Sequence, residues 1–219
     1  MPLTSNWIDV TVPVSGATVV WPGDPAAVIT SIADHDSDGY RLSEVFFNVH
    51  TGTHIDAPLH FLPGGNDISR LDIQALMGLV FILDCSELDR LNSDWILKRI
   101  PEGCTRLFLK TIPDTYKDRK AARQPETMLA LDNHSADALV ALGIVLIGTD
   151  ALSIAAVDCL SDVHIRFAQA NTIVIEHLEL LGCEEGETEM IALPLLLPGS
   201  EAAPARVLIK QTTISSQSE

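Results

Sequence analysis

One stretch of this chain concentrates residue types that bind metal ions, namely His50, His54, Asp56 and His60. The β-branched residues between them, together with Gly52 and Pro58, disfavour a helix, so we expect an extended or looped segment. Alternate side chains of an extended chain share one face, and all four residues have even numbers. Imidazole nitrogens and a carboxylate on one side are typical of a first-row metal site. The alternative is a polar loop with unrelated histidines.

Four ligands on one segment rarely complete such a site, so we also consider candidate metal ligands elsewhere in the chain. Glu176 ends an apolar strand at 172–176, where a buried carboxylate needs a partner that a metal ion could supply. The alternative is a glutamate that emerges into solvent. His164 lies in a weakly patterned stretch, and this pattern alone favours a surface position over a metal ligand.

Two further positions are candidates for function. Asp150 and Ser153 follow a strand at 144–149, where α/β folds place functional side chains. Trp21 lies in a turn made rigid by two prolines and a glycine. Its ring is either a core anchor or a ligand contact, and propensity alone favours the core.

The elements that must position these residues are those of a mixed α/β domain with more strand than helix. Pro194 favours an edge or a bulge for the strand that contains it. Residues 112–127 are predicted to be a surface loop and a candidate for the rim of a pocket. With no repeat or linker, we expect one domain over residues 1–219. The predicted helices are 70–77, 93–99 and 136–142, and the predicted strands are 7–12, 42–49, 79–83, 106–111, 144–149, 172–176, 190–197 and 205–210.

Composition excludes several classes of partner. Of the 219 residues, 47% are hydrophobic and 20% charged, which is ordinary for a soluble globular protein. The formal net charge of −16 disfavours nucleic acid and anionic membrane as partners. No apolar run reaches membrane-spanning length. Four widely spaced cysteines without a CxxC pair, and no signal peptide, favour reduced thiols in a cytoplasm.

The segment HTGTHIDAPLHF at 50–61 resembles the HxGTHxDxPxHF signature of the cyclase family, whose best-known members are bacterial kynurenine formamidases. The resemblance extends over nearly the whole chain. It includes the tryptophan turn at 21–24, a G-x-D-x-x-S segment at 148–153 and a proline-rich pattern at 193–206. His164 also precedes Glu176 by the twelve residues that separate the family's remaining ligands.

The resemblance implies a fold and a role for each matching residue. The fold is an α/β "swivelling" β/β/α domain, dimeric or tetrameric, that binds two divalent metal ions, zinc or manganese. His50, His54 and Asp56 would hold the first ion. Asp56 and Glu176 would bridge to the second, which His164 completes. Two further roles follow: His60 would be the general acid/base, and Trp21 would line the substrate pocket.

These roles amount to metal-assisted hydrolysis. A bound metal makes water nucleophilic at neutral pH, and a histidine can carry the proton to the leaving amine. We therefore expect a small aromatic amide substrate, most simply an aryl formamide such as N-formylkynurenine. An isatin-type lactam or a lactone is an alternative, because Val163 and Ile165 flank His164 where kynurenine formamidases often carry a second histidine. A catalytically silent relative that binds aromatic ligands is the alternative outside enzymes.

Overall fold

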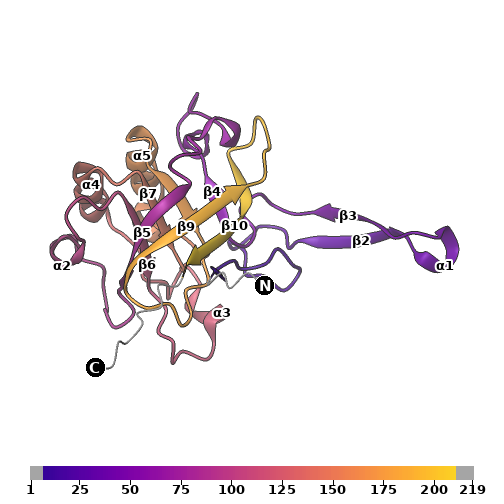
Figure 1. The fold of residues 1–219 in the computed structure, drawn as a ribbon, viewed down its shortest axis with the longest axis horizontal. Helices are drawn as coiled ribbons and strands as arrows, with labels where there is room; N and C mark the ends of the chain where they lie inside the picture. Colours follow the sequence, from indigo (N-terminus) through magenta and orange to yellow (C-terminus); the bar gives the residue numbers. More distant parts are fainter. Residues whose placement is uncertain (1–6, 211–219) are drawn as a thin grey trace, which may run out of the picture.

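A mixed β-sheet dominates the computed structural model, which describes residues 7–210, and this confirms the expected strand-rich α/β class (Figure 1). Its strand order is β1-β10-β4-β8-β7-β6-β5-β9, and β9 also pairs with β10. Seven strands therefore close into a barrel-like ring, with β1 attached outside it. The pairs β5–β6, β6–β7 and β7–β8 are parallel, and the other pairs are antiparallel. The strands are β1 (Trp7–Asp9), β4 (His54–Asp56), β5 (Met77–Asp84), β6 (Arg106–Lys110), β7 (Leu146–Thr149), β8 (Ile173–Glu176), β9 (Gly186–Pro194) and β10 (Ala202–Lys210).

Helices cover the outer face of the parallel strands (Figure 1). Leu107 and Leu109 of β6 pack toward these helices, whereas Phe108 between them packs inside the ring. Alternate side chains thus enter two apolar clusters, which explains the unbroken apolar runs that predicted these strands. The covering helices are α2 (Ser93–Arg99), α4 (Asn133–Leu142) and α5 (Leu160–Gln169), whereas the short α3 (Arg119–Ala122) lies apart from them. The 3-10 turns are η1 (Pro58–His60), η2 (Ile68–Arg70) and η3 (Val157–Cys159). Within residues 7–210 no helix is long and apolar enough to cross a membrane.

A two-stranded arm projects from this body (Figure 1). It consists of β2 (Val28–Ala33) and β3 (Leu42–Phe46), and its tip carries the short helix α1 (His35–Asp38). Its strands pair antiparallel with each other in a sheet of their own. The sequence predicted only the second strand, because Thr30 and Ser31 interrupt the apolar pattern of the first.

The predicted helix at 70–77 is wrong. The chain forms η2 and a turn there, and β5 already begins at Met77. Asp67 caps η2 by accepting from the Ser69 amide, and the Arg106 guanidinium donates to the carbonyls of Gln74 and Ala75. These bonds satisfy backbone groups that a helix would otherwise have paired.

Pro194 does not place β9 at an edge, because β9 pairs with both β5 and β10. Pro194 is the last residue of the strand. Its missing N–H therefore interrupts no interior part of the ladder, and the expectation of an edge or bulge is wrong.

Candidate metal centre

The buried strand β4 carries two of the predicted ligands and faces a third. His54 and Asp56 are two residues apart, so their side chains share a face of the strand. In the antiparallel pairing of β4 with β8, His54 lies opposite Glu176. All three side chains are buried. Pairing two strands that are more than a hundred residues apart thus places two carboxylates and an imidazole together.

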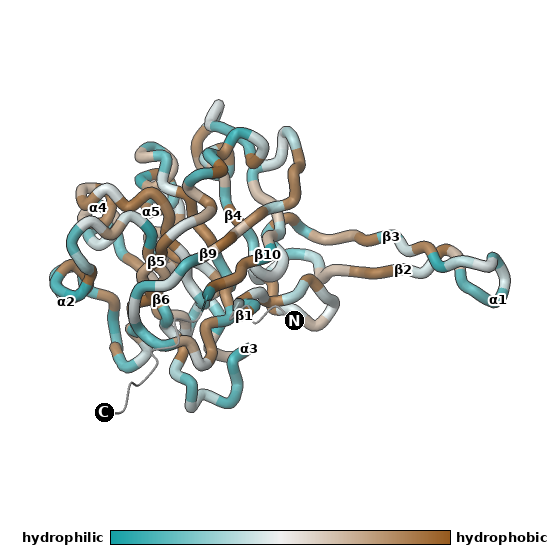
Figure 2. Tube along the Cα trace, in the orientation of Figure 1, coloured by the Kyte–Doolittle hydropathy of each residue, from teal (hydrophilic) through white to brown (hydrophobic). Residues whose placement is uncertain are grey.

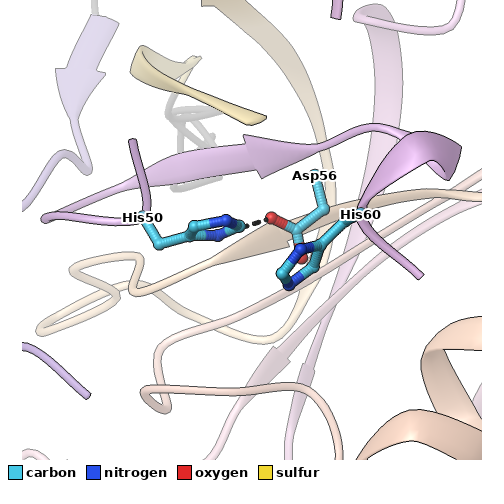
Figure 3. A group of neighbouring side chains, drawn as sticks. All are labelled: His50, Asp56 and His60. Carbon is cyan, nitrogen blue, oxygen red and sulfur yellow. Dashed lines mark ion pairs between the residues drawn. The ribbon is translucent and has the colours of Figure 1, made fainter. Parts of the chain in front are cut away.

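His50 and His60 reach the same region by turns, not by an extended chain (Figure 3). His50 precedes a turn in which Gly52 has φ 69°, and an added Cβ there would lie 2.7 Å from the carbonyl oxygen of Val12. His60 ends the 3-10 turn η1, which Pro58 begins. The prediction of one extended face for all four residues is therefore wrong outside β4, although the four residues do converge.

The distances between donor atoms are short. His54 Nε2 lies 3.4 Å from Asp56 Oδ1 and 3.5 Å from Glu176 Oε2. His50 Nδ1 lies 3.1 Å from Asp56 Oδ1. The ring centroids of His50 and His60 are 4.2 Å apart. Two overlapping sets of three donors, each within 4.8 Å of one another, share Asp56: one adds His50 and His60, the other His54 and Glu176.

His164 joins this group from a helix that the sequence did not reveal. It lies in α5 and is 5% exposed, so the surface position that its local pattern favoured is wrong. Val163 and Phe167 of the same helix are buried against the sheet, and this packing turns His164 inward. Its Nε2 lies 3.1 Å from Glu176 Oε1 and 3.7 Å from Asp56 Oδ2.

Backbone groups hold the imidazoles in one orientation. Nδ1 of His54 is 2.9 Å from the Gly52 carbonyl oxygen, and Nδ1 of His164 is 2.8 Å from that of Leu160. A carbonyl oxygen only accepts, so each Nδ1 carries a hydrogen and each Nε2 points at the carboxylates. Metal-bound histidines are held by contacts of this kind.

Hydrogen bonds from neighbouring groups hold the Glu176 side chain and the backbone around Thr53 in place. Glu176 Oε1 accepts from the Ser153 hydroxyl and from the Ile154 amide, which leaves Oε2 directed toward His54. Thr53 points away from the donors, as its odd position predicts. Its hydroxyl donates to the His177 carbonyl and accepts from the Val12 amide.

Three polar atoms at the centre of this group have no hydrogen-bond partner. His54 Nε2 and both carboxylate oxygens of Asp56 are buried without a hydrogen-bond partner of acceptable geometry. Buried polar groups in that condition are rare in native proteins. Three histidines and two carboxylates around the unpaired atoms are the donor set that zinc and manganese prefer, so these residues fit a divalent cation.

Opposite charges lie close together in the metal-free site. Burial lowers the pKa of His54, but the neighbouring carboxylates of Asp56 and Glu176 outweigh burial and raise this pKa to about 10. Burial raises the pKa of Asp56, but His50 and His54 hold it well below its usual value. Burial lowers the pKa of His60, which keeps that imidazole neutral at pH 7.

These shifts predict that metal binding releases protons. His54 is protonated at pH 7 in the metal-free protein, whereas a metal ligand must be neutral, so the affinity for Mn²⁺ should fall as pH falls. We expect about one proton or more per bound ion and a decrease of roughly tenfold in affinity per pH unit for each proton displaced. Calorimetric titration in two buffers of different ionisation enthalpy measures this number.

A matched control for the proton release is His134→Ala, which removes an exposed histidine outside the site. That variant should release as many protons as the unmodified chain. Binding of Mn²⁺ without proton release would show that the ion does not displace a proton from His54.

A cavity of about 360 Å³ opens beside the donors. Trp21 lines it together with His50, His60 and Glu176, so the indole is a wall of the cavity and not the core anchor that propensity favoured. Sequence reasoning missed Asn48, Asp24 and Glu201, which complete the wall near His50. Asn48 donates to Asp24 Oδ2 and accepts from the His50 amide. No local pattern distinguishes these polar residues from ordinary loop residues.

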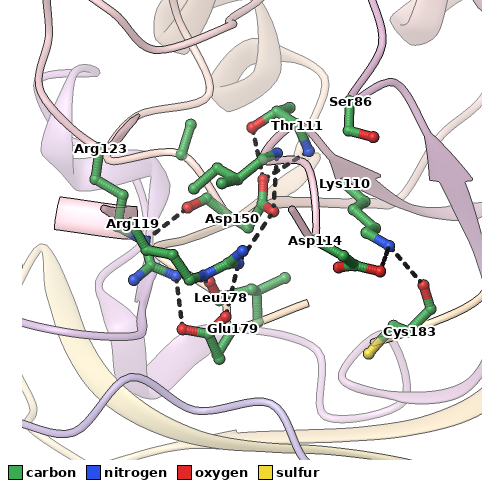
Figure 4. Close-up of polar contacts among 12 residues, drawn as sticks. Ser86, Lys110, Thr111, Asp114, Arg119, Arg123, Asp150, Leu178, Glu179 and Cys183 are labelled. Atoms are coloured by element: carbon green, nitrogen blue, oxygen red, sulfur yellow. Dashed lines mark hydrogen bonds and ion pairs between the residues drawn. The ribbon is translucent and has the colours of Figure 1, made fainter. Parts of the chain in front are cut away.

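Asp150 and the loop at 112–127 do not line this cavity. Asp150 instead accepts from the Thr111 hydroxyl and from the Thr111 and Ile112 amides (Figure 4). Arg123 donates to the carbonyls of Asp150 and Leu178 and to Glu179. The loop is thus anchored to the segments that follow β7 and β8, and it does not line the cavity.

Comparison with known proteins gives consistent matches. A family described as putative cyclase matches residues 8–156. A kynurenine formamidase of Bacillus thuringiensis subsp. konkukian is 34% identical over 94% of this chain and 98% of its own length. A solved structure described as a potential metal-dependent hydrolase with cyclase activity has a TM-score of 0.78 and 31% identity, covering 94% of this chain and 98% of that chain. Isatin hydrolase A from Labrenzia aggregata superposes with a TM-score of 0.77 at 20% identity, covering 93% and 92% of the two chains, and shows the shared fold alone.

Proposed function

This chain belongs to the cyclase family, and we propose that it is a metal-dependent hydrolase of a C–N amide bond, acting on an aryl formamide such as N-formylkynurenine. The observation that carries the proposal is the cluster of histidines and carboxylates with unpaired buried atoms at the wall of a cavity that also holds an indole ring. The full-length similarity to kynurenine formamidases supports the formamide as substrate.

We assign the ligands as follows. His50, His54 and Asp56 would hold one divalent ion, and Asp56, Glu176 and His164 would hold a second. Asp56 belongs to both sets of neighbouring donors, which supports its contribution to both ions. Zinc or manganese suits the mixture of imidazole and carboxylate donors. A divalent ion held there would polarise the substrate carbonyl and lower the pKa of water, so that nucleophilic hydroxide is available near neutral pH.

His60 is assigned the proton transfer. It borders the cavity, and its neutral imidazole can accept a proton from water and deliver it to the departing amine. Phe61, whose ring centroid lies 4.2 Å from that of His60, limits the motion of the imidazole. Trp21 offers the substrate's aromatic ring a surface for stacking on the wall of the cavity.

A hydrolysis screen on metal-reconstituted protein tests the function. We expect turnover of N-formylkynurenine to exceed that of isatin and of simple aryl esters. Faster opening of isatin would make the chain a lactam hydrolase, an alternative favoured by the fold it shares with isatin hydrolase A and by Val163 and Ile165 beside His164. Absence of turnover of all three substrates by metal-loaded protein would contradict the enzymatic proposal.

Replacing Trp21 with alanine is expected to raise KM by about 2- to 12-fold, because aromatic stacking contributes about 0.5–1.5 kcal/mol beyond area burial. Metal content should stay unchanged, since the indole contributes no ligand. Trp21→Phe, which retains a ring, should recover part of the loss. Steady-state kinetics and elemental analysis measure both effects. If Trp21→Ala instead unfolds, and the folded fraction has unchanged kinetics, Trp21 serves the core.

We propose further that the chain is one domain over residues 1–219, acts in the cytoplasm and assembles as a homodimer or homotetramer. The four free cysteines support a reducing compartment. The assembly follows from the resemblance to the family, and its size is measured by sedimentation of the purified protein.

A further inference from the structure

Two carboxylates that are not assigned to the metal ions line the cavity. They belong to Asp24 and Glu201, and Trp21 lines the same cavity. No lysine or arginine of the described residues 7–210 lines it. An occupant of the cavity therefore meets acidic side chains without a basic side chain to balance them, and such a surface favours a cationic group on the occupant.

A tight turn holds Asp24 beside the indole of Trp21. The Asp24 amide donates to the Trp21 carbonyl at 2.9 Å, and Gly23 between them has φ 97°. The side-chain amide of Asn48 donates to Asp24 Oδ2 at 2.9 Å. No hydrogen bond within residues 7–210 uses Oδ1 of Asp24, so this oxygen can accept from a ligand. The turn thus places a carboxylate next to the ring on which we expect the substrate to stack.

Main-chain pairing brings Glu201 to the same cavity from the other end of the sequence. The loop between β9 and β10 changes from hydrophobic to hydrophilic before β10 begins, and Glu201 is its last residue (Figure 2). The Glu201 carbonyl accepts from the Ala57 amide, and Ala202 pairs with Asp56. The Glu201 side chain is 42% exposed, and its Oε1 lies 3.6 Å from His50 Nε2. The backbone is therefore fixed, while the carboxylate remains accessible to a ligand.

The same cavity has a second, independent mark of a ligand site. His54 lines it and is 2% exposed, and its Nε2 has no hydrogen-bond partner. The metal ligands are assigned to the reacting amide, and Trp21 is assigned to the aromatic ring. Asp24 and Glu201 therefore remain for a further substituent on that ring.

We propose that Asp24 and Glu201 bind a primary ammonium group of the substrate, so that the cavity selects aryl formamides whose ring substituent ends in such a cation. This inference rests on the proposed function and specifies its substrate class. An ammonium group has three donors for these carboxylates, and hydrogen bonds between ionised groups are about twice as strong as neutral ones. A carboxylate on the same substituent should not improve binding, because no basic side chain within residues 7–210 lines the cavity.

The competing role of both carboxylates is to support their neighbours, since Asp24 holds Asn48 and Glu201 lies beside His50. Supporting groups affect every substrate alike, whereas recognition of a cation affects only substrates that carry one. The informative quantity is therefore the ratio of kcat/KM between a charged and a neutral substrate, in which a loss common to both cancels.

The test uses three ortho-formamido aryl ketones on the metal-loaded full chain. One has a neutral methyl ketone, one has a side chain that ends in a primary ammonium, and N-formylkynurenine adds a carboxylate to that side chain. The variants are Asp24→Asn and Glu201→Gln, which keep the size of each side chain and an acceptor oxygen. The matched control is Glu102→Gln, which makes the same change of charge at an exposed position that does not line the cavity. Calorimetry with the three deformylated amines measures Kd without requiring turnover.

We expect the unmodified chain and the control to prefer the ammonium substrate over the neutral one by about 10-fold or more. Each variant should lower this ratio by about 3- to 10-fold, because a charge-assisted contact at a partly exposed site contributes less than a buried one. The ratio of the Kd values for the corresponding amines should change in the same direction. N-formylkynurenine should not exceed the substrate that lacks its carboxylate.

Two results would overturn the inference while leaving the amide hydrolase intact. One is an unchanged ratio in both variants, including equal losses on all substrates, which would make the carboxylates supporting groups. The other is a gain of about 10-fold from the carboxylate of N-formylkynurenine. Absence of turnover would contradict the proposed function instead, and the Kd values of the amines would still decide whether Asp24 and Glu201 bind the ammonium group.

Discussion

His54→Ala is expected to lose bound metal and hydrolytic activity together, whereas His60→Ala keeps its metal and loses kcat alone. His54 is 2% exposed, its Nε2 is unpaired, and its Nδ1 is held by a backbone carbonyl, which is the setting of a ligand. His60 lies after Pro58 on a separate turn, with its ring tilted beside that of His50, and its pKa is lowered by burial. A positioned acid/base contributes about 10²–10⁴-fold to rate, or about 3–5 kcal/mol.

Measuring metal content and kcat on both variants separates the two roles. His134→Ala, at an exposed position on α4, is the control and should match the unmodified chain in both quantities. The opposite assignment is a real competitor, because His60 offers a donor atom within 4.8 Å of those of His50 and Asp56. If His60→Ala loses metal as His54→Ala does, His60 is a ligand and the assigned proton transfer fails.

The sequence predicted the parallel strands well because their central residues are largely buried on both faces. Their apolar runs at 79–83, 106–111 and 144–149 are long enough for strands and are bounded by breaks in the pattern. The predicted helix at 70–77 failed because the Arg106 guanidinium satisfies two carbonyls of this segment from a distant strand. A side chain so remote in sequence leaves no trace in local periodicity.

In the candidate site, too, local spacing predicted some residues, whereas others depend on contacts between distant parts of the chain. His54 and Asp56 share a face because they alternate on one strand, which spacing alone predicts. His164 required the resemblance, because its position depends on a helix whose buried face, Val163 and Phe167, falls in a weakly patterned stretch. Asn48 and Glu201 were missed altogether, because only the folded chain brings them to the cavity.

Only one of the two strands of the arm was predicted, and the reason is different. Its first strand is exposed on both faces, so no alternation between apolar and polar residues is imposed by a core within the same chain. Sequence patterns report burial within the monomer most clearly.

Replacing Glu176 is expected to remove metal even where its structural hydrogen bonds are kept. Glu176 Oε1 accepts from the Ser153 hydroxyl and the Ile154 amide, while Oε2 faces His54. Glutamine can retain the first role but carries no charge and places an NH₂ group where the second oxygen stood. Both Glu176→Ala and Glu176→Gln should therefore lose affinity for Mn²⁺ by about 100-fold or more, since groups that merely support ligands cost about 10–100-fold.

The comparison of the two variants decides what Glu176 does. Elemental analysis after gel filtration measures retained metal, and the thermal midpoint with and without a chelator measures how much the ion stabilises each variant. If Glu176 is a ligand, the chelator should lower the thermal midpoint of the unmodified chain but barely change that of either variant. If Glu176 has only a structural role, Glu176→Gln should keep its metal and Glu176→Ala should only be less stable. Unchanged metal content and unchanged activity in Glu176→Ala would show that this carboxylate is not a ligand. The two-ion assignment would then fail, because it needs a donor from β8 beside those of β4.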